Sequence, residues 1–371
     1  MKVRVAIAVG GVVLAPACGA ILGVDDVSYE GSDAAADGGQ SDVTQNDVLP
    51  AGDAQTDAAV SDAGADARLD AEPPIPCDGG CVLLRVDGGT PKGLAIDDAG
   101  TIYVAMHDSR AIYRVQEDGT GAGVAISDAG AVIGIAVDDD LIYWGDTTTS
   151  YMRYAKKTNT TVQGSVASIV PWSVRVGVGG VFWGEFNLGQ ASKVMSYDPG
   201  GGAARPLSTN EQAVADIALD ATQVFVLTDP SDAGSGYIRR IPKSGTGATA
   251  TSAPIAHGHH GFVSGTNVYF TAGAGTTEGT VYTLPVDFTD GQSPTKIATS
   301  QPSPWGIAVR GTTVYFATSD DGKINTMTTS GGPVFSLAIP CGGAFELLLT
   351  STALYASCSR DGTVLKFPGP P

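Results

Sequence analysis

Short apolar stretches alternate with polar turns from Pro91 to the C-terminus, and one phrase of this kind occurs seven times. The phrase is an apolar run, a polar turn, a hydrophobic-aromatic step and a further strand that ends in a Gly-rich turn. Its clearest copies read Gly-Leu-Ala-Ile from Gly93, and Gly-Ile-Ala-Val from Gly134 and from Gly306. The copies share one apolar position, filled in turn by Ile102, Ile142, Val181, Val224, Val268, Val314 and Leu354. Successive copies are therefore 39 to 46 residues apart.

A repeat of this length, made only of strands and turns, is typical of β-propeller blades. In the second copy, residues 132–137, 141–144 and 151–156 read as three strands, and a fourth, outer strand such as 333–338 follows in other copies. No stretch shows sustained helical periodicity with caps. We expect an all-β fold, a seven-bladed β-propeller of four-stranded antiparallel blades. Six or eight blades would require one copy to be misread.

The two ends of the repeat region predict how the ring closes. The last copy stops after its third strand, at Phe367, and an orphan strand, 82–86, stands before the first copy. The economical arrangement makes this N-terminal strand the outer strand of the last blade. Closure of this kind removes an exposed sheet edge.

The first 17 residues predict export from the cytoplasm. Lys2 and Arg4 precede an apolar run, 5–17, that is too short to span a bilayer and is typical of a signal peptide. The run ends in Ala-Pro-Ala before Cys18, which resembles a bacterial lipobox, although the Ala and Pro depart from its usual pattern. We expect Cys18 to carry a lipid. Ordinary secretion after an A-x-A site is the alternative.

Residues 18–76 are predicted to form an acidic disordered tether. Within 25–76 there are thirteen acidic residues, one basic residue and no Phe or Trp. Such a segment cannot bury enough apolar surface to offset the entropy of ordering. It carries about two-thirds of the formal charge of −18, so the acidity says little about the folded domain, 77–371, beyond arguing against a nucleic-acid partner.

Two kinds of phrase in the repeats resemble known propeller families. Ile-Tyr-Trp-Gly-Asp, ending at Asp146, and Val-Phe-Trp-Gly-Glu, ending at Glu185, resemble the Tyr-Trp-Thr-Asp repeat of lipoprotein receptors. The Gly-Ile-Ala-Val copies resemble the NHL repeat and its bacterial relatives. The resemblance covers residues 82–367 and implies the fold. It implies little about activity, because these propellers include binders, scaffolds and a few enzymes.

The alignment of the copies gathers one candidate surface at the mouth of the central channel, where the innermost strand of each blade begins. The mouth position is filled by Gly93, Gly134, Ser173, Asp216, His260, Gly306 and Glu346. The preceding position is filled by Lys92, Ile133, Trp172, Ala215, His259, Trp305 and Phe345. Aromatic, imidazole and carboxylate side chains are therefore predicted to share one face of the ring.

The aromatic members of this surface predict a ligand-binding site. Trp172, Trp305, His259 and Phe345 could stack on sugar faces or grip apolar chains around a concave mouth. The alternative is that the tryptophans wedge between neighbouring blades.

The remaining polar members support a second hypothesis, a metal-dependent lyase or hydrolase. His260, Asp216 and Glu346 offer imidazole and carboxylate ligands suited to a divalent metal ion. The streptogramin lyases, propellers similar to this one, use His and Glu with magnesium. The resemblance to them is one of fold, because this sequence reproduces no full motif of theirs. His259 and His260 are neighbours in a strand, so both would face the channel only with a bulge. Otherwise no cofactor is expected.

The cysteines fit an oxidising compartment. With Cys18 set aside for lipid, an even number remains. Cys341 and Cys358 are expected at the same face within disulfide reach. Cys77 and Cys81 would then close a small loop, although four cysteines allow three pairings.

No Gly-x-Ser-x-Gly, P-loop or His-Glu-x-x-His motif occurs in the repeat region, which favours a protein without catalytic activity. We expect a monomeric binding module, held to a membrane through its lipid anchor, whose ligand is an envelope protein, peptide or glycan. Its expected location is the bacterial outer membrane or cell surface, with a periplasmic or secreted form as the alternative.

Overall fold

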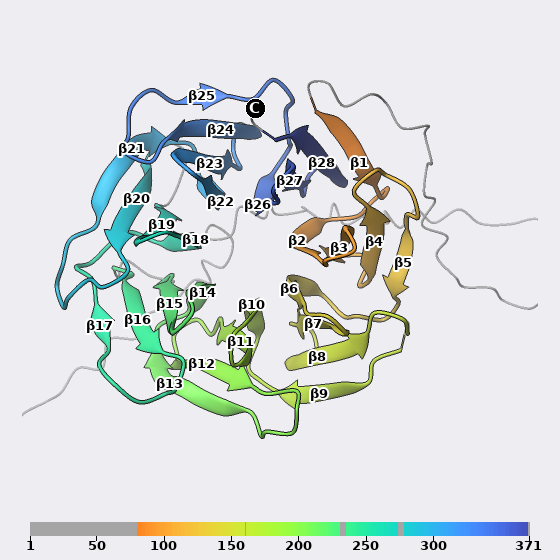
Figure 1. The fold of residues 1–371 in the computed structure, drawn as a ribbon, viewed down its shortest axis with the longest axis horizontal. Helices are drawn as coiled ribbons and strands as arrows, with labels where there is room; N and C mark the ends of the chain where they lie inside the picture. The colour runs from red at the N-terminus through yellow and green to blue at the C-terminus, as the bar shows by residue number, and fades with distance from the viewer. Residues whose placement is uncertain (1–79, 160, 231–234, 274–277, 370–371) are drawn as a thin grey trace, which may run out of the picture. The chain divides into compact units, whose positions relative to one another are not determined.

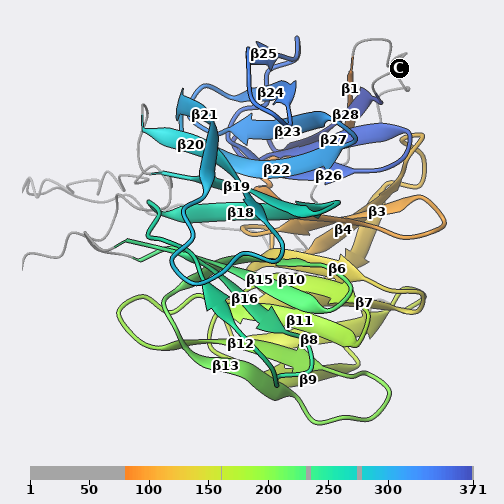
Figure 2. The same ribbon diagram turned by 60° about the vertical axis from the view of Figure 1, so that its left-hand side comes forward.

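The computed structural model describes residues 80–159, 161–230, 235–273 and 278–369, and these form a seven-bladed β-propeller. Their 28 strands make seven four-stranded antiparallel sheets, set around a central axis (Figure 1, Figure 2). The described residues contain no helix, so none that could cross a membrane. The predicted fold class and blade count are confirmed. The signal peptide, Cys18 and the tether were predicted within residues 1–79, outside the described residues.

We number the blades in chain order, each from its inner to its outer strand. Blade 1 contains β2 (Pro91–Ile96), β3 (Thr101–Met106), β4 (Ile112–Gln116) and β5 (Gly123–Ile126). Blade 2 contains β6 (Val132–Val137), β7 (Leu141–Asp146), β8 (Tyr151–Lys156) and β9 (Gly164–Ala167). Blade 3 contains β10 (Pro171–Gly177), β11 (Gly180–Glu185), β12 (Ser192–Tyr197) and β13 (Arg205–Glu211). Blade 4 contains β14 (Val214–Leu219), β15 (Gln223–Thr228), β16 (Ile238–Pro242) and β17 (Ala250–Thr251).

Blade 5 contains β18 (Gly258–Ser264), β19 (Asn267–Ala272), β20 (Gly279–Pro285) and β21 (Thr295–Gln301). Blade 6 contains β22 (Pro304–Arg310), β23 (Thr313–Thr318), β24 (Lys323–Thr328) and β25 (Phe335–Ser336). Blade 7 contains β26 (Ala344–Leu349), β27 (Ala353–Cys358), β28 (Thr363–Pro368) and β1 (Cys81–Arg85). The outer strand of blade 6 is shorter than the predicted 333–338.

Burial follows the order of the strands within a blade. The second strand lies between two neighbours and packs against adjacent blades on both faces, so all six residues of β3 are buried. Such strands read as continuous apolar runs because neither face meets water. The outer strand β13 is mostly exposed and reads Arg-Pro-Leu-Ser-Thr-Asn-Glu. The core is therefore a set of apolar layers between blades, each drawing on two neighbouring sheets.

The ring closes as the ends of the repeat region predict. β1 pairs antiparallel with β28, from Cys81 opposite Lys366 to Arg85 opposite Thr363. Leu84 in this strand is 3% exposed and packs in the cluster between blades 7 and 1. The first described strand and the last thus belong to one sheet (Figure 1).

The Cys341–Cys358 disulfide is also confirmed. It joins the chain just before β26 to the last residue of β27, with the Cα atoms 4.9 Å apart. Cys81 is also disulfide-bonded, and Cys77, its expected partner, lies outside the described residues.

Each inner strand carries a bulge near its start. In β18 the pairing with β19 shifts between Gly258 and Gly261, and shifts of the same kind occur in the other six inner strands. A bulge turns consecutive side chains out of strict alternation. It therefore decides where the side chains at the channel mouth point.

Candidate functional site

The glycines of the mouth ring allow neighbouring inner strands to approach closely. A Cβ atom on Gly93 would lie 2.2 Å from the carbonyl oxygen of Ile133 in the next blade, and one on Gly306 would lie 2.6 Å from that of Phe345. Gly134 makes an equally close approach to blade 3. These positions contribute to blade packing, and no side chain from them can line the mouth.

Where the ring position carries a side chain, that side chain links blades by hydrogen bonds. The Asp216 carboxylate accepts a hydrogen bond from the Ser173 hydroxyl and another, at 2.9 Å, from the backbone N–H of Gly261. Ser173 Oγ in turn accepts the backbone N–H of Ile217 at 3.2 Å. Asp216 is 1% exposed. Through these hydrogen bonds it ties blades 3, 4 and 5 together.

The three residues of the predicted metal site lie together, with an arginine among them. The Arg175 guanidinium is 3.0 Å from the Asp216 carboxylate and 3.6 Å from that of Glu346. His260 Nδ1 lies 3.4 Å from the Glu346 carboxylate and 3.9 Å from that of Asp216. We call Arg175, Asp216, His260 and Glu346 the charge cluster. It joins blades 3, 4, 5 and 7 at the channel mouth.

Burial and the neighbouring charges act in opposite directions on the pKa values of Glu346 and Arg175. Burial raises the pKa of Glu346, and the positive charge of Arg175 and the interaction with His260 partly oppose that rise. Burial alone would lower the pKa of Arg175, but the Asp216 and Glu346 carboxylates outweigh it, so the pKa is raised. Arg175 thus supplies a permanent positive charge between the two carboxylates.

This arrangement does not fit a metal centre. A divalent ion bound by Asp216, His260 and Glu346 would need the space and the charge that Arg175 already supplies. Among the described residues, no group of three His, Cys, Asp or Glu side chains is placed to hold a metal ion. We therefore derive no catalytic step through a metal.

The predicted aromatic ligand site is largely an inter-blade stack. The His259 ring lies parallel to Trp305 at 4.4 Å between centroids, and Trp305 stacks on Phe345 at 4.8 Å. These side chains are 5%, 7% and 6% exposed, respectively. The stack runs across blades 5, 6 and 7. For Trp305 the structure thus agrees with the alternative reading, packing between blades.

His259 and Trp172 have different environments within this site. Burial lowers the pKa of His259 to about 4, so the ring is neutral at physiological pH and its Nδ1–H donates to the Pro304 carbonyl at 2.5 Å. Trp172 is only partly buried and stacks on Phe186 at 4.7 Å. Of the four predicted aromatic ligand residues, Trp172 offers the most accessible surface.

The mouth has almost no free internal volume. Its cavity measures about 10 Å³, roughly the space for one water molecule. Ile133, Trp305 and Phe345 form one apolar cluster, with the partly buried Trp172 packed against it. The Lys92 ammonium lies 4.3 Å from the centre of the Phe345 ring. The mouth is therefore a closed surface of aromatic and charged side chains.

The chain is similar to solved β-propellers. No protein-family model and no curated protein matches it. Virginiamycin B lyase from Staphylococcus aureus is 15% identical, with a TM-score of 0.61 over 75% of this chain and 94% of that one. Hydrazine synthase of Kuenenia stuttgartiensis is 10% identical, with a TM-score of 0.62 over 76% and 96%. BamB from Moraxella catarrhalis is 15% identical, with a TM-score of 0.51 over 74% and 82%.

At these identities the likeness shows the fold alone. Because proteins with such different activities share this fold, the function of this chain must be argued from its site.

Arg175 is the member of the charge cluster that the sequence analysis missed. It stands two residues after Ser173, so the strand period brings both toward the same side of β10. A signal was present, because the equivalent position is alanine in four other copies: Ala95, Ala136, Ala218 and Ala308. An arginine in place of a small apolar residue, in a buried inner strand, indicates a carboxylate partner nearby.

Proposed function

We propose that this propeller is a binding module without catalytic activity, which contacts a protein, peptide or glycan of the cell envelope through its channel mouth. The closed mouth is the observation that carries the proposal. A cavity of about 10 Å³ leaves no room to enclose a small molecule at the mouth, whereas small-molecule sites enclose several hundred Å³. A closed surface with accessible Trp and Arg suits a larger partner that lies across it.

The accessible part of the mouth defines the partner's chemistry. The side chains of Arg175 and Glu346 are 26% and 15% exposed, Trp172 lines the same mouth, and Lys92 lies over the Phe345 ring; both are partly buried. Aromatic faces next to paired charges bind peptide or sugar groups that offer both apolar surface and hydrogen-bonding atoms. The charge cluster holds these groups in place before the partner arrives, which lowers the entropic cost of binding.

We further propose that the module works outside the cytoplasm, on a lipid-anchored tether. The proposal rests on the signal-like residues 1–17, on Cys18 and on the acidic segment 18–76. The Cys341–Cys358 disulfide supports an oxidising compartment. The relation to the NHL and Tyr-Trp-Thr-Asp repeat families belongs to the same proposal and rests on the motifs alone. A metal-dependent lyase with His260, Glu346 and Asp216 is not favoured, because Arg175 lies among these side chains.

Site-specific photo-crosslinking in the native envelope tests the binding face. A photoreactive amino acid replaces Trp172 at the start of β10 in one variant and Val178 in a matched control. Val178 is 76% exposed just beyond the other end of the same strand, on the opposite face of the ring. We expect one defined envelope component to crosslink at position 172, with loss of the crosslink on Arg175→Ala. Equal crosslinking at both positions would contradict the proposal.

A further inference from the structure

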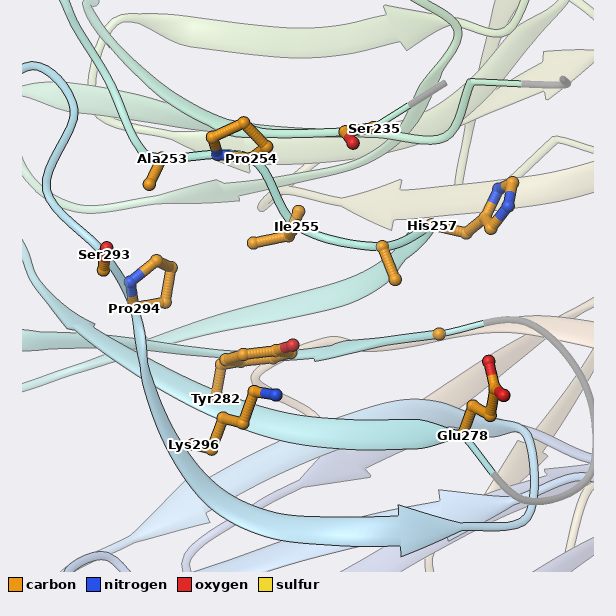
Figure 3. Close-up of a pocket in the computed structure, with 12 residues that line it drawn as sticks. Ser235, Ala253, Pro254, Ile255, His257, Glu278, Tyr282, Ser293, Pro294 and Lys296 are labelled. Carbon is orange, nitrogen blue, oxygen red and sulfur yellow. The ribbon is translucent and has the colours of Figure 1, made fainter. Parts of the chain in front are cut away.

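A large cleft lies away from the channel mouth, between blades 4 and 5 (Figure 3). Its volume is about 580 Å³, within the range of small-molecule sites. Among the described residues its lining includes residues 253–257, which connect the two blades, and Glu278, Tyr282, Pro294 and Lys296 from blade 5. Hydrogen bonds fix its walls, since Ile255 N donates to Gly236 O at 2.9 Å and Gly273 N donates to His257 O at 2.7 Å.

One end of the cleft holds an oriented imidazole. His257 Nδ1 is hydrogen-bonded to the Asp229 carboxylate, whose side chain is 4% exposed, while the His257 side chain is 21% exposed. Burial raises the pKa of Asp229, and the hydrogen bond and charge of His257 oppose that rise. No hydrogen bond between a described residue and His257 Nε2 is present in the structure.

The cleft has separated charges of opposite sign. Lys296 and Glu278 both line it and are both exposed, and Figure 3 shows them apart, with Glu278 on the same side of the view as His257. The Glu278 end therefore offers a carboxylate, which suits an ammonium group. The Lys296 end offers an ammonium, which suits a carboxylate.

Apolar and rigid surface also lines the cleft. Pro254, Ile255 and Pro294 present aliphatic atoms to the cleft. The Tyr282 ring, 8% exposed, is held by stacking on Phe270 at 5.1 Å. A wall that is already ordered loses little entropy when an apolar side chain packs on it.

The size of the cleft limits the length of its ligand. A sphere of the same volume is about 10 Å across, and an extended chain spans roughly 3.5 Å per residue. We propose that the cleft binds a short peptide with free ends, about three residues long with an apolar middle side chain. Its ammonium lies toward Glu278 and His257, and its carboxylate toward Lys296. The site is independent of the channel mouth.

Calorimetric titration of the purified full chain with three probes tests this assignment. The probes are the tripeptide Ala-Leu-Ala, its N-acetylated form and its C-terminal amide. We expect the free tripeptide to bind, and each blocked form to bind roughly fivefold to tenfold more weakly, because each loses one charged hydrogen-bonding group. Lys296→Met should abolish the difference between acid and amide. Glu278→Gln should weaken the difference between the free and acetylated forms.

Two controls make the outcome decisive. Lys156→Met removes an exposed lysine from blade 2, and Trp172→Ala alters the channel mouth, so both should leave tripeptide binding unchanged. Absence of saturable binding would overturn the proposal. So would equal affinity for the acid and the amide, equal losses in Lys296→Met and Lys156→Met, or loss of binding in Trp172→Ala. A failure of the cleft leaves the crosslinking result at position 172 unaffected, so the two proposals fail separately.

Discussion

Replacing Arg175 by methionine should destabilise the propeller in a pH-dependent way. The substitution keeps an aliphatic stem of similar length but removes the charge that lies 3.0 Å from Asp216 and 3.6 Å from Glu346. Two buried carboxylates are then left facing one another, next to His260. Breaking a buried ion pair from one side costs roughly 3–5 kcal/mol. About a quarter of the Arg175 side chain is exposed, so we expect a smaller loss of about 2 kcal/mol near pH 8.

The direction of the pH dependence follows from Glu346. Burial raises its pKa above the unfolded value, and Arg175 opposes the rise, so Arg175→Met should raise the pKa further. A carboxyl with a raised folded-state pKa stabilises the fold while it is protonated, and that contribution is lost as the pH rises through the folded pKa. The destabilisation by Arg175→Met should therefore be larger at pH 8 than at pH 5.

Urea unfolding followed by tryptophan fluorescence at pH 5 and pH 8 measures this effect. Arg114→Met, at an exposed position of β4, is the matched control and should change stability little at either pH. Adding Glu346→Gln to Arg175→Met should recover part of the loss, which a double-mutant cycle quantifies. A loss below about 0.5 kcal/mol at pH 8, typical of surface substitutions, would refute the argument, as would equal losses at both pH values.

Two further predictions concern the mouth. Gly306→Ala places a Cβ 2.6 Å from the Phe345 carbonyl oxygen and should lower Tm by several degrees. Gly123→Ala, with no atom within 4 Å of its Cβ, should leave Tm unchanged, and equal Tm values by calorimetry would contradict the role of Gly306 in blade packing. Burial lowers the pKa of Lys92 to about 8, so its amine should be mostly neutral at pH 9 and should acetylate faster there than Lys156 in mass-spectrometric labelling. The Lys92 rate should fall only about tenfold from pH 9 to pH 7, and equal rates for the two lysines at pH 9 would count against the lowered pKa.

Much of the fold could be predicted from the sequence because the repeat register is a local signal. One aligned apolar position per copy predicted the number of blades, seven. The orphan strand before Pro91 predicted that the ring closes by pairing of this strand within blade 7. The same register brought Asp216, His260 and Glu346 to one surface, although no two of them are near in sequence.

The detailed environment of the site could not be predicted in this way. Trp305 and Phe345 were in register at the mouth, but the register does not say whether an aromatic ring faces solvent or a neighbouring blade. That choice depends on bulges and on the packing of three inner strands. The cleft at His257 was also missed, because Lys296 and Glu278 come from an outer strand and a connection that the aligned copies do not share.

The pairing of β1 with β28 has a consequence for the order of folding. Cys81 pairs with Lys366, which lies near the other end of the propeller sequence, so this sheet cannot be completed until residues 363–366 have been synthesised. Contacts of such long range are slow to form, since the loop-closure entropy is lost before the contact is made. Until β1 pairs with it, β28 presents a free edge, which can pair with another chain. The slowest step in folding the propeller should therefore be the pairing of β1 with β28.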